Sequence, residues 1–331
     1  MILSFSIIIP VYNRPYEVKE LLDSLLLQTY QNIFEIIIVE DGSKIKSNGI
    51  VNSFKDKLNI TYLFKENSGP GESRNEGMKI AKGNYFIILD SDVILPNTYI
   101  QEVDNALNQN FTDAYAGADK AHKSFSGIQK AINFAMTSFI TTGGLRNNKG
   151  NNTFQLRSFN MGLSKKAFQL TDGFAKQYIG EDIDLNYKLD ALQLNKQFIL
   201  KGYVYHKRRV NFKQFYNQTN NFGRARPLLN KMHKNSSKFT YWFPSLFIIF
   251  FISSLIGLLF GISYLFYLFG FYFMSVFVIA SINNNNAFVG LLSVLATIVQ
   301  FFGYGIGFLQ SQFKLKFLKK SNKETFPKMF S

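Results

Sequence analysis

The sequence predicts an α/β domain built on a largely parallel sheet, followed by a region of apolar helices that anchors the chain in a membrane. Three observations carry this prediction. Over the first 200 residues, short apolar runs typical of buried strands alternate with helical patterns, as expected for βαβ units. Acidic residues directly follow two of these runs. No Asp, Glu, Lys or Arg occurs between Tyr241 and Phe313, a composition typical of membrane spans.

Charge is divided unequally along the chain. The net charge of +15 comes from 37 basic and 22 acidic residues. From Lys201 to Ser331 there are 16 basic residues and one acid, Glu324, whereas the first 200 residues are balanced. A basic segment directly before an apolar region favours anionic lipid headgroups over nucleic acid as its partner. The absence of cysteine excludes disulfides and thiolate metal sites.

The first two strands and the helix between them are predicted from periodicity. The apolar run 5–11 is typical of a strand buried on both faces, and it ends at the turn Asn13-Arg14-Pro15. This run is short and lacks a basic lead, so it is not a signal peptide, and we expect the domain to stay in the cytoplasm. Apolar residues recur at helical spacing over 17–28, and a second strand, 34–39, ends in Glu40-Asp41-Gly42-Ser43.

Two further strands complete one edge of the predicted sheet. The strand 60–64 leads into a Gly-rich loop and a helix over 73–81 with Arg74 near its start, an arrangement that suits an anionic ligand. The strand 85–89 ends in Asp90 and Asp92, which are spaced to hold a divalent cation together with phosphate oxygens. Because the carboxyl ends of parallel strands share one edge, we expect a nucleotide-sized site there.

Four sequence blocks, in this order and spacing, resemble the donor half of the family 2 glycosyltransferases, which have the GT-A fold with its Rossmann-like mixed sheet. The blocks are SIIIPVYNRP, IIIVEDGS, NSGPGESRNEG and FIILDSDVILP. The family usually has Asp-Asp before Gly-Ser, where this chain has Glu40-Asp41. The departure is mild, because the second acid is the one usually matched to the nucleotide base.

The resemblance implies a nucleotide-sugar site, with a UDP-sugar favoured, and Mg²⁺ or Mn²⁺ as cofactor. Asp41 and Arg74 would contact the base, and Asp90 and Asp92 would serve ribose, metal and diphosphate, with Asp92 the better candidate for direct metal contact. The implied nucleotide-sugar-binding residues are Pro10, Tyr12, Asn13, Asp41, Gly42, Arg74, Asn75, Asp90, Ser91 and Asp92.

The acceptor half shows Asn-Met, Gly-Phe and Gly-Glu-Asp in the order that these glycosyltransferases share. The resemblance places the catalytic acid on Asp182 and acceptor-side residues at Asn160, Met161 and Glu181. A carboxylate at a helix start can take the proton of an acceptor hydroxyl. A strand over 198–206 ends in His206, which could serve as a further metal ligand.

The segment between the two halves is less regular. A helix is expected over 99–108, and apolar residues recur at helical spacing over 125–140. The apolar face of this second helix packs either into the core or onto the membrane. The polar loop 141–153 that follows is a candidate lid.

The membrane region divides into candidate spans near 242–260, 264–282 and 287–309, and Gly303, Gly305 and Gly307 indicate close helix packing in the last. Three spans would put the Lys-rich tail opposite the basic segment, whereas two spans plus an interfacial piece would keep both inside. The expected divisions are a GT-A domain over 1–210 (donor half 1–96, acceptor half 97–210), a basic juxtamembrane segment over 211–240, transmembrane helices over 241–311 and a basic tail over 312–331.

These features predict an inverting, metal-dependent glycosyltransferase at the inner face of a cell membrane. It would move a sugar from a nucleotide donor to a glycan or lipid-linked acceptor in cell-surface glycan synthesis. A polyprenyl-phosphate sugar synthase is the second enzyme class, although the Gly-Glu-Asp block favours a hydroxyl acceptor. The non-enzyme alternative is a membrane scaffold with an inactive transferase fold, against which the intact acids argue.

Overall fold

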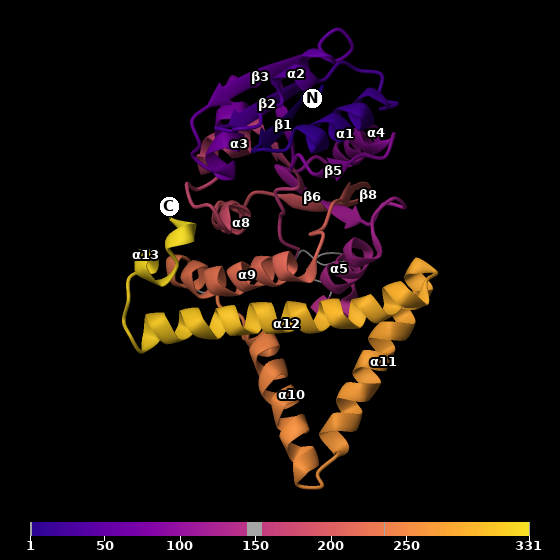
Figure 1. The fold of residues 1–331 in the computed structure, drawn as a ribbon. Coiled ribbons are helices and arrows are strands. Elements are labelled where there is room, and N and C mark those ends of the chain that lie inside the picture. Colours follow the sequence, from indigo (N-terminus) through magenta and orange to yellow (C-terminus); the bar gives the residue numbers. More distant parts are fainter. Residues whose placement is uncertain (1, 144–153, 235, 331) are drawn as a thin grey trace. The chain divides into compact units, whose positions relative to one another are not determined.

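The computed structural model describes residues 2–143, 154–234 and 236–330. The chain divides into two compact units (Figure 1). The first, the sheet unit, comprises Met1–His122 and Leu145–Lys207, and the second, the helical unit, comprises Lys123–Gly144 and Arg208–Ser331.

An eight-stranded mixed sheet forms the centre of the sheet unit, in the order β3-β2-β1-β4-β7-β6-β8-β5. The strands are β1 (Phe5–Val11), β2 (Glu35–Asp41), β3 (Ile60–Lys65), β4 (Tyr85–Leu89), β5 (Val93–Ile94), β6 (Ala114–Lys120), β7 (Asn160–Ser164) and β8 (Lys196–His206). Strands β1 to β4 are parallel, as predicted, whereas β7 runs antiparallel to β4 and β6. This confirms the predicted GT-A type of mixed sheet.

Helices cover both faces of this sheet. They are α1 (Pro15–Leu26), α2 (Asn48–Asn52), α3 (Pro70–Ile80), α4 (Tyr99–Gln109), α7 (Lys165–Thr171) and α8 (Glu181–Ala191). Alternate residues of β4 face opposite sides, so Ile87 packs with α1 and α4, and Ile88 packs with α3, α7 and α8. The apolar runs are buried on both faces for this reason.

The sheet topology brings the chemically active residues to one edge. Strands β1, β2 and β4 end together because they are parallel and in register. The short strand β5 pairs antiparallel with the end of β8, with Val93 opposite His206. His206 therefore lies next to Asp92, although 114 positions separate them in the sequence.

Among its described residues, the helical unit has three helices long and apolar enough to cross a membrane. They are α10 (Phe243–Leu259, extended to residue 239 by the 3-10 turn η1, Phe239–Trp242), α11 (Tyr264–Asn284) and α12 (Ala287–Lys316). Its other elements are α5 (Gly127–Thr137), α6 (Phe139–Thr142), α9 (Phe212–Met232), α13 (Asn322–Thr325) and η2 (Pro327–Met329). These three apolar helices support the predicted membrane association.

The helix predicted over 125–140 differs from the expectation in two ways. It breaks at Ser138, whose backbone is extended, into α5 and α6. Its apolar face packs against α9 and α12, with Ala131, Ile132 and Ala135 around Phe215 and Ala296. Residues 123–144 therefore group with the helical unit and not with a continuous 1–210 domain. Most of the candidate lid, residues 144–153, lies outside the described residues.

Candidate active site

Asp41, the last residue of β2, organises the Gly-rich loop that precedes α3. Its carboxylate accepts hydrogen bonds from the amides of Ser68 and Gly69, both at 2.9 Å, and an ion pair from Lys65 at 2.6 Å. Asp41 is buried. The preceding acid, Glu40, is also buried and accepts hydrogen bonds from Ser43, from the Ser47 amide and from Tyr62. The two acids therefore fix the loops around the strand ends.

The turn after β1 is held against the turn after β2. Asn13 has a φ of 54°, and its side-chain oxygen accepts from the amides of Lys44 and Ile45 at 2.8 and 3.0 Å. Gly42 has a φ of +70°, and a Cβ there would lie 2.7 Å from the Asn67 amide nitrogen. Only glycine fits this position without displacing the loop. Pro10 is partly buried, and Tyr12 is exposed at the same turn.

Asp92 lies between the side chains of Arg14 and His206. Its Oδ2 pairs with Arg14, and its Oδ1 lies 3.4 Å from His206 Nε2. The His206 ring stacks on Phe159 with ring centroids 4.5 Å apart. Burial alone would raise the pKa of Asp92, but the charges and hydrogen bonds of His206 and Arg14 outweigh it and hold this pKa well below the usual carboxyl range. Asp92 is therefore ionised throughout the physiological range.

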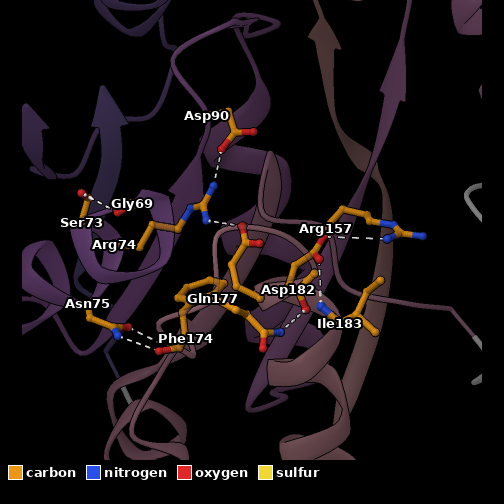
Figure 2. A network of polar contacts seen from close by, with 12 residues as sticks. Gly69, Ser73, Arg74, Asn75, Asp90, Arg157, Phe174, Gln177, Asp182 and Ile183 are labelled. Atoms are coloured by element: carbon orange, nitrogen blue, oxygen red, sulfur yellow. Dashed lines mark hydrogen bonds and ion pairs between the residues drawn. The ribbon is translucent and has the colours of Figure 1, made fainter. Parts of the chain in front are cut away.

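Arg74 connects the donor edge to helix α8. It is buried, and its Nη2 pairs with Asp90 at 2.7 Å while its Nη1 pairs with Glu181 at 2.9 Å. Figure 2 shows Arg74 reaching toward Asp90. Burial would lower the pKa of the guanidinium, yet the two carboxylates hold it above its usual value. Asn75 makes a second connection by exchanging two hydrogen bonds with the Phe174 backbone.

Asp182 lies in the first turn of α8, which begins after Gly180. Its Oδ1 accepts from the Ile183 amide at 2.8 Å, and its Oδ2 lies 3.8 Å from Arg157 Nη1 (Figure 2). The side chain is 15% exposed. A carboxylate here is stabilised by the helix N-terminus and remains open to a ligand. Asp182 can therefore accept a proton from a bound hydroxyl group.

Comparison with known proteins identifies the domain. Residues 6–170 match the family described as Glycosyl transferase family 2. A glycosyltransferase of Rickettsia typhi, described as uncharacterized, is 48% identical over 104 residues, which are 31% of this chain and 32% of that protein. Residues 6–170 belong to glycosyl transferase family 2. The glycosyltransferase GlyG of Streptococcus pneumoniae is 36% identical over 114 residues, 34% of this chain and 38% of GlyG.

The matched segments therefore span about a third of each relative's length. Among solved structures, a mannosyltransferase of Pyrobaculum calidifontis in complex with GDP-Man and Mn²⁺ aligns with a TM-score of 0.52 at 14% identity. The alignment covers 67% of this chain and 63% of that one. This likeness supports the fold.

One group of side chains in the sheet unit suits a divalent cation. Asp90, Asp92 and His206 each offer a ligand atom within 4.8 Å of the others. Oxygen donors with one imidazole fit Mn²⁺ or Mg²⁺. Asp92 Oδ1 is buried and lies 3.4 Å from His206 Nε2, so two of the three ligand atoms already face each other. A cation could draw on both of them, so the residues present fit the predicted metal.

Of the other predicted site residues, Ser91 lies in a turn, and Asn160 and Met161 lie on β7. Ser91 is buried within the Asp90–Asp92 turn. Asn160 is fully buried, and its amide bonds to Tyr99, to Ala118 O and to Gly202 O, while Met161 belongs to the core. We therefore assign Asn160 and Met161 to the support of the sheet rather than to acceptor contact.

Sequence reasoning missed three contributors to the candidate site. Arg14 pairs with Asp92, Phe159 stacks on His206, and Arg157 lies beside Asp182. Arg14 lies within a quoted family block, and Phe159 directly precedes Asn160. Their proximity to known motif residues was the available signal, whereas their partners depend on the tertiary fold.

A pH-dependent stability follows from Glu181. Burial and the neighbouring Asp182 raise the pKa of Glu181 to about 7, with Arg74 opposing this shift. The folded chain thus binds a proton that the unfolded chain releases near pH 4.3, so this residue's contribution to stability is lost as the pH rises toward and through 7. Glu181→Gln removes the titration. The melting temperature of the variant minus that of wild type, measured in detergent micelles, should increase from pH 5 to pH 8. A constant difference across this range would contradict the assignment.

Proposed function

We propose that this chain is an inverting glycosyltransferase that depends on a divalent cation and transfers a sugar from a nucleotide-sugar donor to a hydroxyl group. The acceptor is a glycan or a lipid-linked acceptor delivered at the cytoplasmic face of a cell membrane, in the synthesis of cell-surface glycan. The observation that carries the proposal is the Arg74 bridge. It joins Asp90 of the donor edge to Glu181, the neighbour of Asp182.

Donor binding is assigned to the strand ends of residues 1–96. The loop amides held by Asp41, together with the turn at Asn13, form the nucleotide side. Asp90, Asp92 and His206 would hold Mg²⁺ or Mn²⁺, which when bound neutralises charge on the leaving diphosphate. Arg14 pairs with Asp92. Once a cation replaces Arg14 beside this carboxylate, the guanidinium is still close enough to contact the same diphosphate. A UDP-sugar is the first donor to test.

The transfer step is assigned to Asp182 of the acceptor half, residues 97–210. Its carboxylate takes the proton of the acceptor hydroxyl as that oxygen forms a bond to the anomeric carbon. The bond from that carbon to the donor diphosphate breaks, and the nucleoside diphosphate leaves with the electron pair. A single displacement from the opposite face inverts the configuration.

Release of nucleoside diphosphate by the purified full chain in detergent micelles tests the proposal. We expect release from one member of a panel of UDP- and GDP-sugars, dependent on added Mn²⁺ or Mg²⁺ and abolished by a chelator. Asp92→Asn should raise the cation concentration needed for half-maximal activity at least tenfold, because it removes one charged ligand. The matched control is Asp23→Asn, an exposed acid of α1. Full release in the presence of chelator would overturn the metal dependence, and release from no donor would favour the inactive scaffold.

A further inference from the structure

Helix α12 packs along α9, which is a polar helix. Gly303 and Gly307 of α12 touch α9 so closely that a Cβ would lie 2.0 Å from Thr219 Oγ1 and 2.3 Å from Asn220 O. Asn220 Nδ2 also donates to Gly303 O at 3.1 Å. This confirms that the glycines permit close packing, as the sequence indicated.

Helix α9 has a composition that excludes it from the hydrocarbon core of a membrane. It contains Lys213, Arg224, Arg226 and Lys231 with several Asn and Gln residues, and each charged group at the bilayer centre would cost about 2.5–3.5 kcal/mol or more. Lys213 and Lys231, at opposite ends of the helix, are exposed. The stretch of α12 that lies against α9 therefore lies at the membrane surface.

Among the described residues, the hairpin contacts α12 through the first half of α10 and the last part of α11, which form its open end. A Cβ at Gly305 would lie 2.8 Å from Pro244 O, at the start of α10, and Ser245 Oγ donates to Gly305 O at 3.1 Å. A Cβ at Gly290 would lie 2.0 Å from Ser281 Oγ, near the end of α11. The two contact points are 15 residues, or about 22 Å, apart along α12.

This contact pattern distinguishes a crossing helix from a third span. A third span antiparallel to α11 would follow that helix toward the α10–α11 turn at Gly261. Instead, α12 passes from the end of α11 to the start of α10 across the open end of the hairpin, as Figure 1 shows within the helical unit. The hairpin points away from α12, and its turn exposes Leu259 and Phe260.

The C-terminal tail lies on the same side as α9. Arg224 Nη2 donates to Thr325 O at 3.2 Å, and its guanidinium lies 4.4 Å from the centre of the Phe326 ring. Exposed lysines of the tail, Lys319, Lys320 and Lys323, are therefore grouped with the basic side of α9. With the tail and α9 on the same side of the membrane, the positive-inside rule is satisfied. A third span would place the tail on the opposite side and break the rule.

We propose that the chain crosses the membrane twice, through α10 and α11, and that α12 lies in the plane of the membrane surface beneath α9. The exposed apolar side chains along α12, Phe288, Leu291, Leu295 and Phe313, then contact the acyl boundary. The basic tail contacts anionic headgroups on the same leaflet as the segment before α10. This topology does not depend on the proposed reaction.

Single-cysteine accessibility tests the topology directly, because the natural chain has no cysteine. Ser237→Cys precedes α10, Ser263→Cys lies in the hairpin turn, Asn283→Cys lies near the end of α11, and Lys320→Cys lies in the tail. A membrane-impermeant maleimide should label the cysteines at 237, 283 and 320 in inside-out vesicles and the cysteine at 263 only in right-side-out vesicles. Labelling of 320 from the same side as 263 would overturn the proposal, and so would labelling of all four from one side.

Depth measurements give a second readout that does not depend on vesicle orientation. Nitroxide labels at exposed positions 291, 295 and 313 of α12 should report one shallow depth, because the helix lies in the plane. Labels at exposed positions 282 and 278 of α11 should differ, with 278 about 6 Å deeper by the rise per residue. A depth that changes along α12 as steeply as along α11 would contradict the in-plane assignment.

Discussion

Asp182→Asn is expected to lower the turnover number by about 10²–10⁴-fold while leaving the KM for the donor within a factor of about two. The amide cannot accept the proton of the acceptor hydroxyl, but it keeps the size and the Ile183 hydrogen bond of the carboxylate. The measurement is steady-state release of nucleoside diphosphate in the presence of acceptor.

The matched control is Asp190→Asn on the same helix, since that side chain is 50% exposed and pairs only with Lys196 and Asn186 among the described residues. The control should retain wild-type turnover. Equal turnover for Asp182→Asn and wild type would remove Asp182 from the role of base. Loss of donor binding in Asp182→Asn would instead assign it to the donor side.

Arg74→Met is expected to destabilise the sheet unit by about 3–5 kcal/mol, because it leaves the buried Glu181 and the partly buried Asp90 without their shared cation. Glu181 and Asp90 share this guanidinium, and its own side chain is only 3% exposed. Pulse proteolysis of the full chain in detergent, as a function of urea concentration, measures the loss. Lys79→Met on the same helix removes an exposed ion pair with Glu76 and should cost no more than about 1 kcal/mol.

A double variant separates charge from packing at this site. Arg74→Met combined with Glu181→Gln should recover more than half of the lost stability, because the neutral amide no longer needs a cation. It should not recover activity, since Asp90 also loses its partner. If the double variant is no more stable than Arg74→Met alone, the loss comes from packing of the guanidinium against Phe174.

Local patterns predicted strands β1 to β4 and β8 well, but they did not indicate β5, β6 or β7. Strands β1 and β4 have the predicted bounds, because each is a continuous apolar run bounded by turn residues. An element begins at a residue other than the predicted one where residues outside the periodic pattern determine its start. Helix α3 begins at Pro70 rather than at 73, since Gly69 supplies a φ of 94° before it. Helix α8 begins at Glu181, which places Asp182 in its first turn, at the helix start.

The sequence by itself determined the order of the strands along the chain, the acids at their carboxyl ends, and the apolar length of α10 to α12. These depend on composition and on periodicity within a few residues. Only the tertiary structure decided which charges meet. Arg74 joins Asp90 and Glu181, His206 reaches Asp92, and α12 crosses its hairpin, because sheet pairing and helix packing bring together residues that are far apart in the chain. Local periodicity carries no information on such pairings, since many partners of the same charge or polarity would satisfy it equally.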